Sequence, residues 1–185
     1  MCLAPLCRAA DRPPPPRLPL AQFWSVDVGS AVSAGPVSDG DRVFLAFKSA
    51  HLSARDAADG SELWKIDKNV TAPLAAGGGF VFVSAGDAIE ALRGSDGATA
   101  WIVPRIKVVA PLLAHDGWLI AVTDAEVLAI RASDGHVVWR LPAGGIRQAP
   151  AIDGDRLYLG ADDGRLLGVT LATGAVAWER YVAGG

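Results

Sequence analysis

The sequence predicts an all-β protein, a β-propeller of four-stranded antiparallel blades, with about four blades present. Tryptophans recur at Trp64, Trp101, Trp139 and Trp178, at intervals of 37, 38 and 39 residues. Between them, short runs of alternating apolar and polar residues are separated by Asp-Gly and similar turns, which are hairpin signals. Repeats of this length indicate a propeller or a solenoid, and four strands per repeat favour the propeller.

Composition narrows the possible classes of protein. The 185 residues are 51% apolar and 20% charged, as in a globular protein, and the net charge is −3. Nucleic-acid-binding proteins usually carry a basic excess, so we expect no nucleic-acid partner. No apolar run is long enough for a membrane-spanning helix. The two cysteines, Cys2 and Cys7, provide neither a disulfide framework nor zinc-site spacing.

Residues 1–19 are expected to lie outside the propeller. They combine a short apolar stretch, small residues before a possible cleavage after Ala9, and a proline-rich tether. This pattern favours the remnant of a secretory signal, although a basic start and a longer apolar region are missing. We therefore predict an exported, periplasmic protein; the alternative is a cytosolic protein with a proline-rich N-terminus. Leu6 stands where a lipoprotein signal needs a small residue, which disfavours Cys7 as a lipid anchor.

Residues 21–28 are predicted to form a solitary strand that carries Trp24. This strand lacks the glycine found four residues before the other tryptophans, because Leu20 stands there. Propeller rings commonly close by adding an N-terminal strand to the last blade. We therefore expect Trp24 to belong to a closing blade whose other strands lie elsewhere.

Residues 20–185 hold the repeats, with blades predicted at about 31–67, 71–104, 109–142 and 148–182. The last blade shows the pattern well, as "APAID", "RLYLG", "RLLGVTL" and "AVAWER" are separated by turn residues. Prolines recur in step, at Pro36, Pro73, Pro111 and Pro150. Helical periodicity is absent.

The recurring line is small-x-x-x-x-(Asp/Thr)-Gly-x-x-x-Trp. A glycine supplies the positive φ of the turn, and an indole can bury its ring while its N–H reaches a carbonyl. The small residue, on the neighbouring strand, leaves room for the ring. We therefore predict a structural docking role, rather than ligand binding, for three sets of residues. These are Trp24, Trp64, Trp101, Trp139 and Trp178; Gly60, Gly97, Gly135 and Gly174; and Ala54, Ala91 and Ala129, with Gly168 in the fourth copy.

This line resembles the PQQ-type repeat family, the tryptophan-docking β-propellers. The family includes quinoprotein alcohol dehydrogenases and the propeller lipoprotein of the outer-membrane barrel-assembly machinery. The resemblance covers residues 20–185 and implies that each ring stacks between adjacent blades of a seven- or eight-bladed propeller. We therefore expect about half a ring here, completed by further blades or by a second chain.

For a quinoprotein enzyme, the resemblance implies a calcium site, a catalytic aspartate and a vicinal Cys-Cys pair. The sequence has no Cys-Cys and a single asparagine, Asn69, so we expect no catalytic residue, cofactor or metal site. The three histidines, His51, His115 and His136, occupy different positions in their repeats and predict no cluster. The aspartate-rich turns lack the ligand spacing of a calcium loop.

Charge placement predicts a polarised disc. Aspartates gather in the first–second and third–fourth strand turns, on one face, whereas cations gather in the connections between blades, on the other. Arg105, Lys107, Arg140 and Arg147 are therefore candidates for binding a partner through the basic face. The alternative is that these charges serve solubility alone.

By analogy with the family, we predict a non-enzymatic scaffold that binds other envelope proteins, as in outer-membrane assembly. Two alternatives remain open, because fold does not determine function. One is a fragment of a PQQ-dependent quinoprotein dehydrogenase, and the other is the ligand-sensing propeller of a signalling protein.

Overall fold

The computed structural model describes residues 22–182, which form sixteen strands. The strands pair into four antiparallel sheets of four strands, each in sequence order, so the predicted all-β propeller blades are confirmed. Residues 1–19, with Cys2, Cys7 and the predicted signal remnant, lie outside the described residues. In the described range there is no helix that could cross a membrane.

Each sheet is one blade. Blade 1 comprises β1 (Val37–Ser38), β2 (Arg42–Phe47), β3 (His51–Asp56) and β4 (Glu62–Asp67). Blade 2 comprises β5 (Ala75–Gly77), β6 (Phe80–Ala85), β7 (Ala88–Arg93) and β8 (Thr99–Pro104). Blade 3 comprises β9 (Leu113–His115), β10 (Trp118–Val122), β11 (Glu126–Arg131) and β12 (Val137–Pro142). Blade 4 comprises β13 (Ala151–Asp153), β14 (Arg156–Gly160), β15 (Arg165–Thr170) and β16 (Val176–Tyr181).

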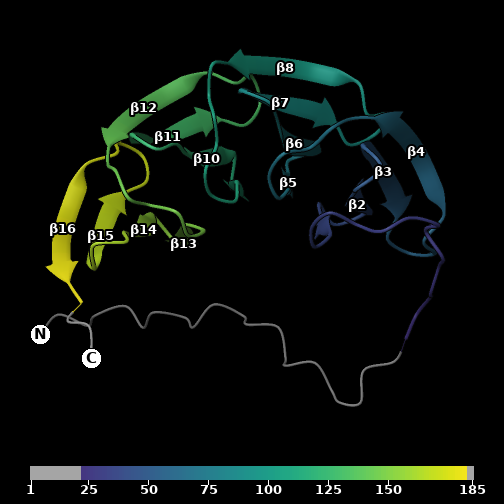
Figure 1. Ribbon diagram of the computed structural model, residues 1–185, viewed down its shortest axis with the longest axis horizontal. Coiled ribbons are helices and arrows are strands. Elements are labelled where there is room, and N and C mark those ends of the chain that lie inside the picture. The colour runs from purple at the N-terminus through teal and green to yellow at the C-terminus, as the bar shows by residue number, and fades with distance from the viewer. Residues whose placement is uncertain (1–21, 183–185) are drawn as a thin grey trace, which may run out of the picture.

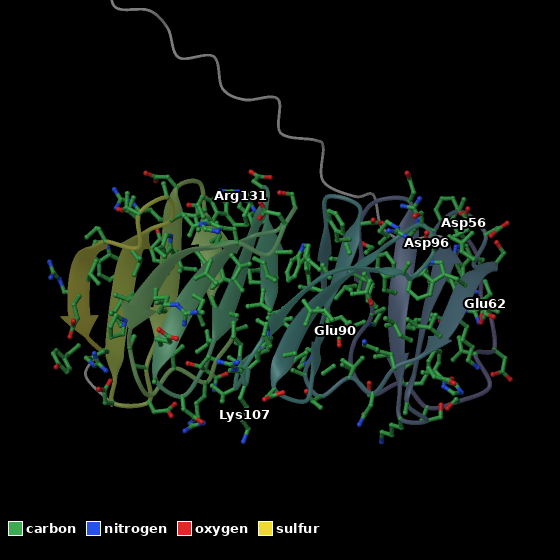
Figure 2. The ribbon with its side chains drawn as sticks, turned by 90° about the horizontal axis from the view of Figure 1, so that it is seen from above. Asp56, Glu62, Glu90, Asp96, Lys107 and Arg131 are labelled. Atoms are coloured by element: carbon green, nitrogen blue, oxygen red, sulfur yellow. The ribbon has the colours of Figure 1, made fainter. Side chains whose placement is uncertain are left out.

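The four blades stand side by side along an arc (Figure 1). The fourth strands, β4, β8, β12 and β16, lie on its outer side, and the short first strands lie on its inner side. Seen edge-on, Asp56, Asp96 and Arg131 lie along one face of the arc and Lys107 along the other (Figure 2). We call the first the motif face, which carries the third–fourth strand turns. The second is the connection face, which carries the segments between blades.

The first strands are shorter than the repeat pattern predicts. β1 has two residues, and β5, β9 and β13 have three each. The recurring prolines explain this difference, since each stands one to two residues before its strand and has no N–H to give to a ladder. Pairing therefore begins only after the proline.

Apolar side chains fill the space between adjacent blades. Phe44 and Leu52 of blade 1 pack with Val81 and Val83 of blade 2, and all four are fully buried. Two corresponding clusters join blade 2 to blade 3 and blade 3 to blade 4. The core is therefore a series of interfaces between sheets rather than one central cluster.

A β-bulge recurs at the same place in every blade. The register between the third and fourth strands shifts directly after Ala54, Ala91, Ala129 and Gly168, the small residues of the motif. Because a bulge inserts one unpaired residue and increases the local twist, it bends each outer strand next to its tryptophan.

Residues 22–28 differ from the predicted strand. They carry no strand assignment, although Trp24 lies against blade 1. A strand is defined by its ladder, and no described residues supply a neighbouring strand for this segment. Its assignment to a closing blade stays a prediction.

Candidate functional site

Trp24, Trp64, Trp101 and Trp139 each contact the blade that follows them along the chain. The indole N–H donates a hydrogen bond to a backbone carbonyl 30 to 33 residues further on. The pairs are Trp24 with Ala57 (2.9 Å), Trp64 with Gly94 (2.8 Å), Trp101 with Ala132 (2.9 Å) and Trp139 with Leu171 (2.7 Å). Trp139 is buried and the other three are half-buried, and these carbonyls provide the partner that an indole N–H needs when it leaves water.

The motif glycines receive these same rings. Gly60, Gly97, Gly135 and Gly174 have φ between 71° and 76°, the left-handed region that favours glycine. A Cβ on any of them would lie within 3.0 Å of the docked indole, which belongs to Trp24, Trp64, Trp101 and Trp139 respectively. Glycine is therefore required twice, for the turn and for the close approach of the ring.

The carbonyl residues complete what we call the docking sites, each made of one motif glycine and the residue three positions before it. Ala57, Gly94, Ala132 and Leu171 accept the indole N–H, and each donates its own N–H to the first–second strand turn of its blade, to Asp41, Gly79, Gly117 and Asp155 respectively. Sequence reasoning missed these residues. They do recur at a constant position, seven residues before each motif tryptophan. This constant spacing is the signal that could have identified them.

The small motif residues lie across the ladder from the tryptophan of their own blade. Ala54 faces Trp64, and Ala91 faces Trp101. Gly168 faces Trp178, where a Cβ would lie 2.3 Å from Cε2 of the ring. Glycine at this position of the fourth copy therefore leaves the space that the Trp178 ring occupies.

The Asp or Thr before each motif glycine closes the turn. Asp59, Asp96, Asp134 and Thr173 each accept the N–H of the residue two positions later. The Ser61 N–H lowers the pKa of Asp59, and Arg93 together with the Ala98 N–H lowers the pKa of Asp96. For Asp134, the His136 N–H is the main cause of a lowered pKa. The main role of these aspartates is thus to accept backbone N–H groups within the turn.

The predicted partner-binding cations fall into two pairs. Arg140 forms an ion pair with Glu126, and Arg147 lies 3.3 Å from Asp124 and 3.4 Å from Asp162. Arg105 and Lys107 are exposed and make no ion pair with any residue between 22 and 182. The structure therefore leaves the second pair with unbalanced charge.

Arg105 and Lys107 flank a buried anchor on the segment between blades 2 and 3. Ile106 is 4% exposed, and its N–H donates to the Asp87 carbonyl at 2.7 Å. Arg105 has φ of 61°, which is uncommon for a residue with a side chain. Two cations are thus held at the surface of the connection face by a fixed backbone.

Ion pairs reduce the predicted polarity of the disc. On the motif face, Arg93 pairs with Asp96 and Arg131 pairs with Asp134. On the connection face, Arg165 lies 2.6 Å from Asp163. Both faces therefore carry charges of both signs. A partner would recognise a local group of charges rather than the overall charge of a face.

Two adjoining hollows lie on the motif face at His115, Asp116 and Trp118. One, of about 410 Å³, is also lined by Phe82 of blade 2, and the other, of about 280 Å³, by Leu171 of blade 4. Calcium takes about six to eight oxygen ligands, whereas the larger hollow offers one carboxylate. Within residues 22–182, no three His, Cys, Asp or Glu side chains gather as metal ligands. The described residues do not fit a calcium-bound quinone.

Sequence comparison identifies one matching family model. That model, described as outer membrane protein assembly factor BamB, matches residues 21–115 and 107–185. No curated protein matches the sequence.

Solved structures share the fold. BamB from Moraxella catarrhalis matches with a TM-score of 0.64 and 20% identity, over 87% of this chain and 55% of its own. Quinohemoprotein alcohol dehydrogenase from Comamonas testosteroni matches with a TM-score of 0.68 and 15% identity, over 82% and 35%. The computationally designed Ika8 protein matches with a TM-score of 0.64 and 19% identity, over 78% and 48%. This chain spans about half the length of that BamB, and identities this low indicate the fold alone.

Proposed function

The chain belongs to the family described as outer membrane protein assembly factor BamB, and from this membership we propose a non-enzymatic propeller scaffold that binds other cell-envelope proteins. A periplasmic location is part of the proposal. Repeated docking of one blade on the next supports it, because half-buried and buried indoles bonded to backbone carbonyls make a stiff support for surface loops.

The observation that carries the proposal is the pair Arg105 and Lys107. The buried Ile106 holds them in place, so a partner meets two cations with little loss of backbone freedom. Their charges are not balanced by described residues, so they favour an acidic segment of the partner. Unpaired surface charges of this kind act mainly on the rate and specificity of association.

Photo-crosslinking tests this site. A photoreactive amino acid at position 104, next to the loop, should form crosslinks to an envelope protein in cells that make this chain. Arg105→Glu with Lys107→Glu should reduce the crosslinked yield at least about tenfold, as expected when like charges replace attractive ones. The matched control is Lys48→Glu with Lys65→Glu, which changes net charge equally on exposed sites of blade 1. Equal yields from the two double variants would exclude this loop.

The absence of an enzymatic role is tested separately. If the hollow at His115 and Trp118 bound a quinone, adding PQQ with calcium would give saturable quenching of tryptophan fluorescence. We expect no saturable change. A binding curve that reaches saturation and is lost in Asp116→Asn would instead favour the dehydrogenase fragment.

A further inference from the structure

The first–second strand turns have the same length in all four blades but differ in their last residue. Each turn has four residues, and the pairing between its first and last residues fixes which positions correspond. The first residues are Asp39, Gly77, His115 and Asp153, and the last are Arg42, Phe80, Trp118 and Arg156. Blades 1 and 4 thus place an arginine where blade 3 places a tryptophan.

The two arginines lie beside carboxylates of their own turns. The pairs are Arg42 Nη1 with Asp39 Oδ2, at 3.6 Å, and Arg156 Nε with Asp155 Oδ1, at 3.5 Å. The blade 3 turn also has a carboxylate, Asp116, whose side chain is 87% exposed. Its ion-pair partner within residues 22–182 is His115, at 3.4 Å. The blade 3 turn therefore keeps a carboxylate but lacks the guanidinium that accompanies it in blades 1 and 4.

Trp118 lines the hollow of about 280 Å³ between blades 3 and 4. Its half-buried side chain packs on the apolar cluster that joins these two blades. The same hollow is lined by Leu171, which is 6% exposed, and by one acidic residue from each blade, Asp116 and Asp155. The hollow thus combines an indole, an aliphatic side chain and two acidic residues.

The nearest arginines of the chain are already engaged elsewhere. Arg131 lies across the ladder from Trp118 on the motif face (Figure 2), and it forms an ion pair with Asp134 at 2.7 Å. Arg156 holds the position at which Phe80 and Trp118 pack toward the blade that follows them, so it faces away from blade 3. Asp116 is therefore the carboxylate of this hollow that an external cation would meet.

We propose that this hollow binds an arginine side chain of a partner protein. The guanidinium stacks on the Trp118 ring and pairs with Asp116, while the methylene groups contact Leu171. A planar guanidinium can make the stacked and the bidentate contact together, which an ammonium cannot. The turns of blades 1 and 4 make the same pairing of arginine with aspartate inside the chain.

This site goes beyond the proposed loop of Arg105 and Lys107. That loop lies on the connection face and favours an acidic segment, whereas the hollow lies on the motif face and favours a basic one. One chain could therefore hold two partners of opposite charge, one on each face.

Fluorine NMR of the full chain labelled with 5-fluorotryptophan tests the site. The chain has six tryptophans, and Trp118→Phe identifies the Trp118 signal. N-acetyl-arginine amide should shift this signal to saturation. N-acetyl-citrulline amide, which has the same shape without the charge, should bind at least about tenfold more weakly, and the lysine compound should also bind more weakly. Equal binding of arginine and citrulline, or of arginine and lysine, would overturn the proposal.

A pair of carboxylate variants locates the contact. Asp116→Asn should weaken binding of N-acetyl-arginine amide at least about tenfold. The turn is kept, because asparagine tolerates the φ of 42° at this position. The matched control is Asp41→Asn, which removes an exposed carboxylate from the corresponding turn of blade 1 and should leave binding unchanged. Equal losses in the two variants would indicate a general effect of charge and contradict the site.

Two further measurements separate this proposal from others. For a separate partner, the Trp118 signal of the chain alone should stay constant as its concentration rises. A concentration-dependent shift that Asp116→Asn abolishes would place the arginine on a second copy and contradict the proposal. Arg105→Glu with Lys107→Glu should leave the titration unchanged, so failure of the loop and failure of the hollow are distinguishable. A titration lost in that double variant would also contradict the hollow.

Discussion

The interface between blades 1 and 2 and the interface between blades 2 and 3 share a frame but differ in chemistry at one position. In the first, Lys68 Nζ lies 2.5 Å from Glu90, with side chains 19% and 12% exposed. In the second, Ile106 and Leu128 are buried in an apolar cluster. The positions correspond, because Lys68 and Ile106 donate their N–H groups to Ala50 and Asp87, the matching second–third turns.

This difference teaches which part of an interface fixes the geometry. Glu90 and Leu128 each stand eleven residues before the motif tryptophan of their own blade. The tryptophans that dock in the two interfaces, Trp64 and Trp101, donate to the carbonyls of Gly94 and Ala132 in the same way. A buried ion pair and an apolar pair can replace each other when both partners change together. The docking contact therefore sets the blade spacing, whereas the neighbouring position accepts either chemistry.

The largest effect should come from breaking the apolar interface with a charge. Leu128→Glu places a carboxylate against Ile106 without a cation and should lower the free energy of unfolding by about 3–5 kcal/mol. Urea denaturation followed by tryptophan fluorescence measures this. Adding Ile106→Lys should restore a substantial part of the loss by recreating the blade 1–2 pair. A loss below about 1 kcal/mol would show that the two interfaces differ in water access.

The docking contact should matter equally in both interfaces. Trp64→Ala and Trp101→Ala should each cost about 3 kcal/mol, since each leaves a cavity and an unpaired carbonyl. Thermal unfolding followed by circular dichroism compares them. The matched control is Trp178→Ala, which removes an indole without an acceptor among the described residues and should cost less. A large gap between the first two variants would contradict a common frame.

The ion pair itself should contribute little net stability. Glu90→Leu alone should cost about 1–3 kcal/mol, because Lys68 loses a charged hydrogen-bond partner. The double variant Lys68→Ile with Glu90→Leu, which copies the blade 2–3 interface, should lie within about 1 kcal/mol of the natural protein. Chemical denaturation of both variants gives the comparison. A double variant as unstable as the single one would show that the apolar pair does not fit between blades 1 and 2.

The smallest effect concerns pH. The lowered pKa of Asp96, caused by Arg93 and the Ala98 N–H, and of Asp134, caused mainly by the His136 N–H, links both turns to stability. This contribution is fully present above the unfolded pKa of about 3.9 and is lost as the pH falls from there through the lowered folded pKa. Asp96→Thr and Asp134→Thr, which copy Thr173, should each flatten the acid side of a melting-temperature profile to a similar extent. Profiles that match the natural protein would contradict this.

Much of the fold could be predicted from the sequence, because the signals are local and repeated. The strand pattern recurs four times, and so does the spacing of the small residue, the glycine and the tryptophan that Ala91, Gly97 and Trp101 represent. Four matching copies make a chance resemblance negligible. The first strands are shorter than the repeat pattern predicts, because the sequence does not show at which residue after the proline a ladder can begin. Residues 22–28 match a strand locally, but a strand needs a neighbour that a single segment does not reveal.

The site was harder to predict, because its key groups are backbone atoms or distant pairs. The carbonyl of Gly94 has no side-chain signature, and only its phase marks it. Lys68 lies on the segment between blades 1 and 2, and Glu90 lies 22 residues later on β7 of blade 2. Neither residue therefore predicts the other from the sequence. The same holds for Arg147, whose ion-pair partners Asp124 and Asp162 come from two different blades. The sequence predicts Arg147 as an unpaired cation, whereas these carboxylates neutralise its charge.

The indole contacts also set an order of events during synthesis. Each of the four docked tryptophans comes 30 to 33 residues before the carbonyl that accepts its N–H. At about 5–20 residues per second, a nascent chain holds each indole without its acceptor for roughly 2–6 seconds. A growing chain of this kind therefore always presents one exposed aromatic at its most recent blade. A chaperone or a partner that binds an undocked indole would therefore meet the same exposed side chain once for each newly synthesised blade.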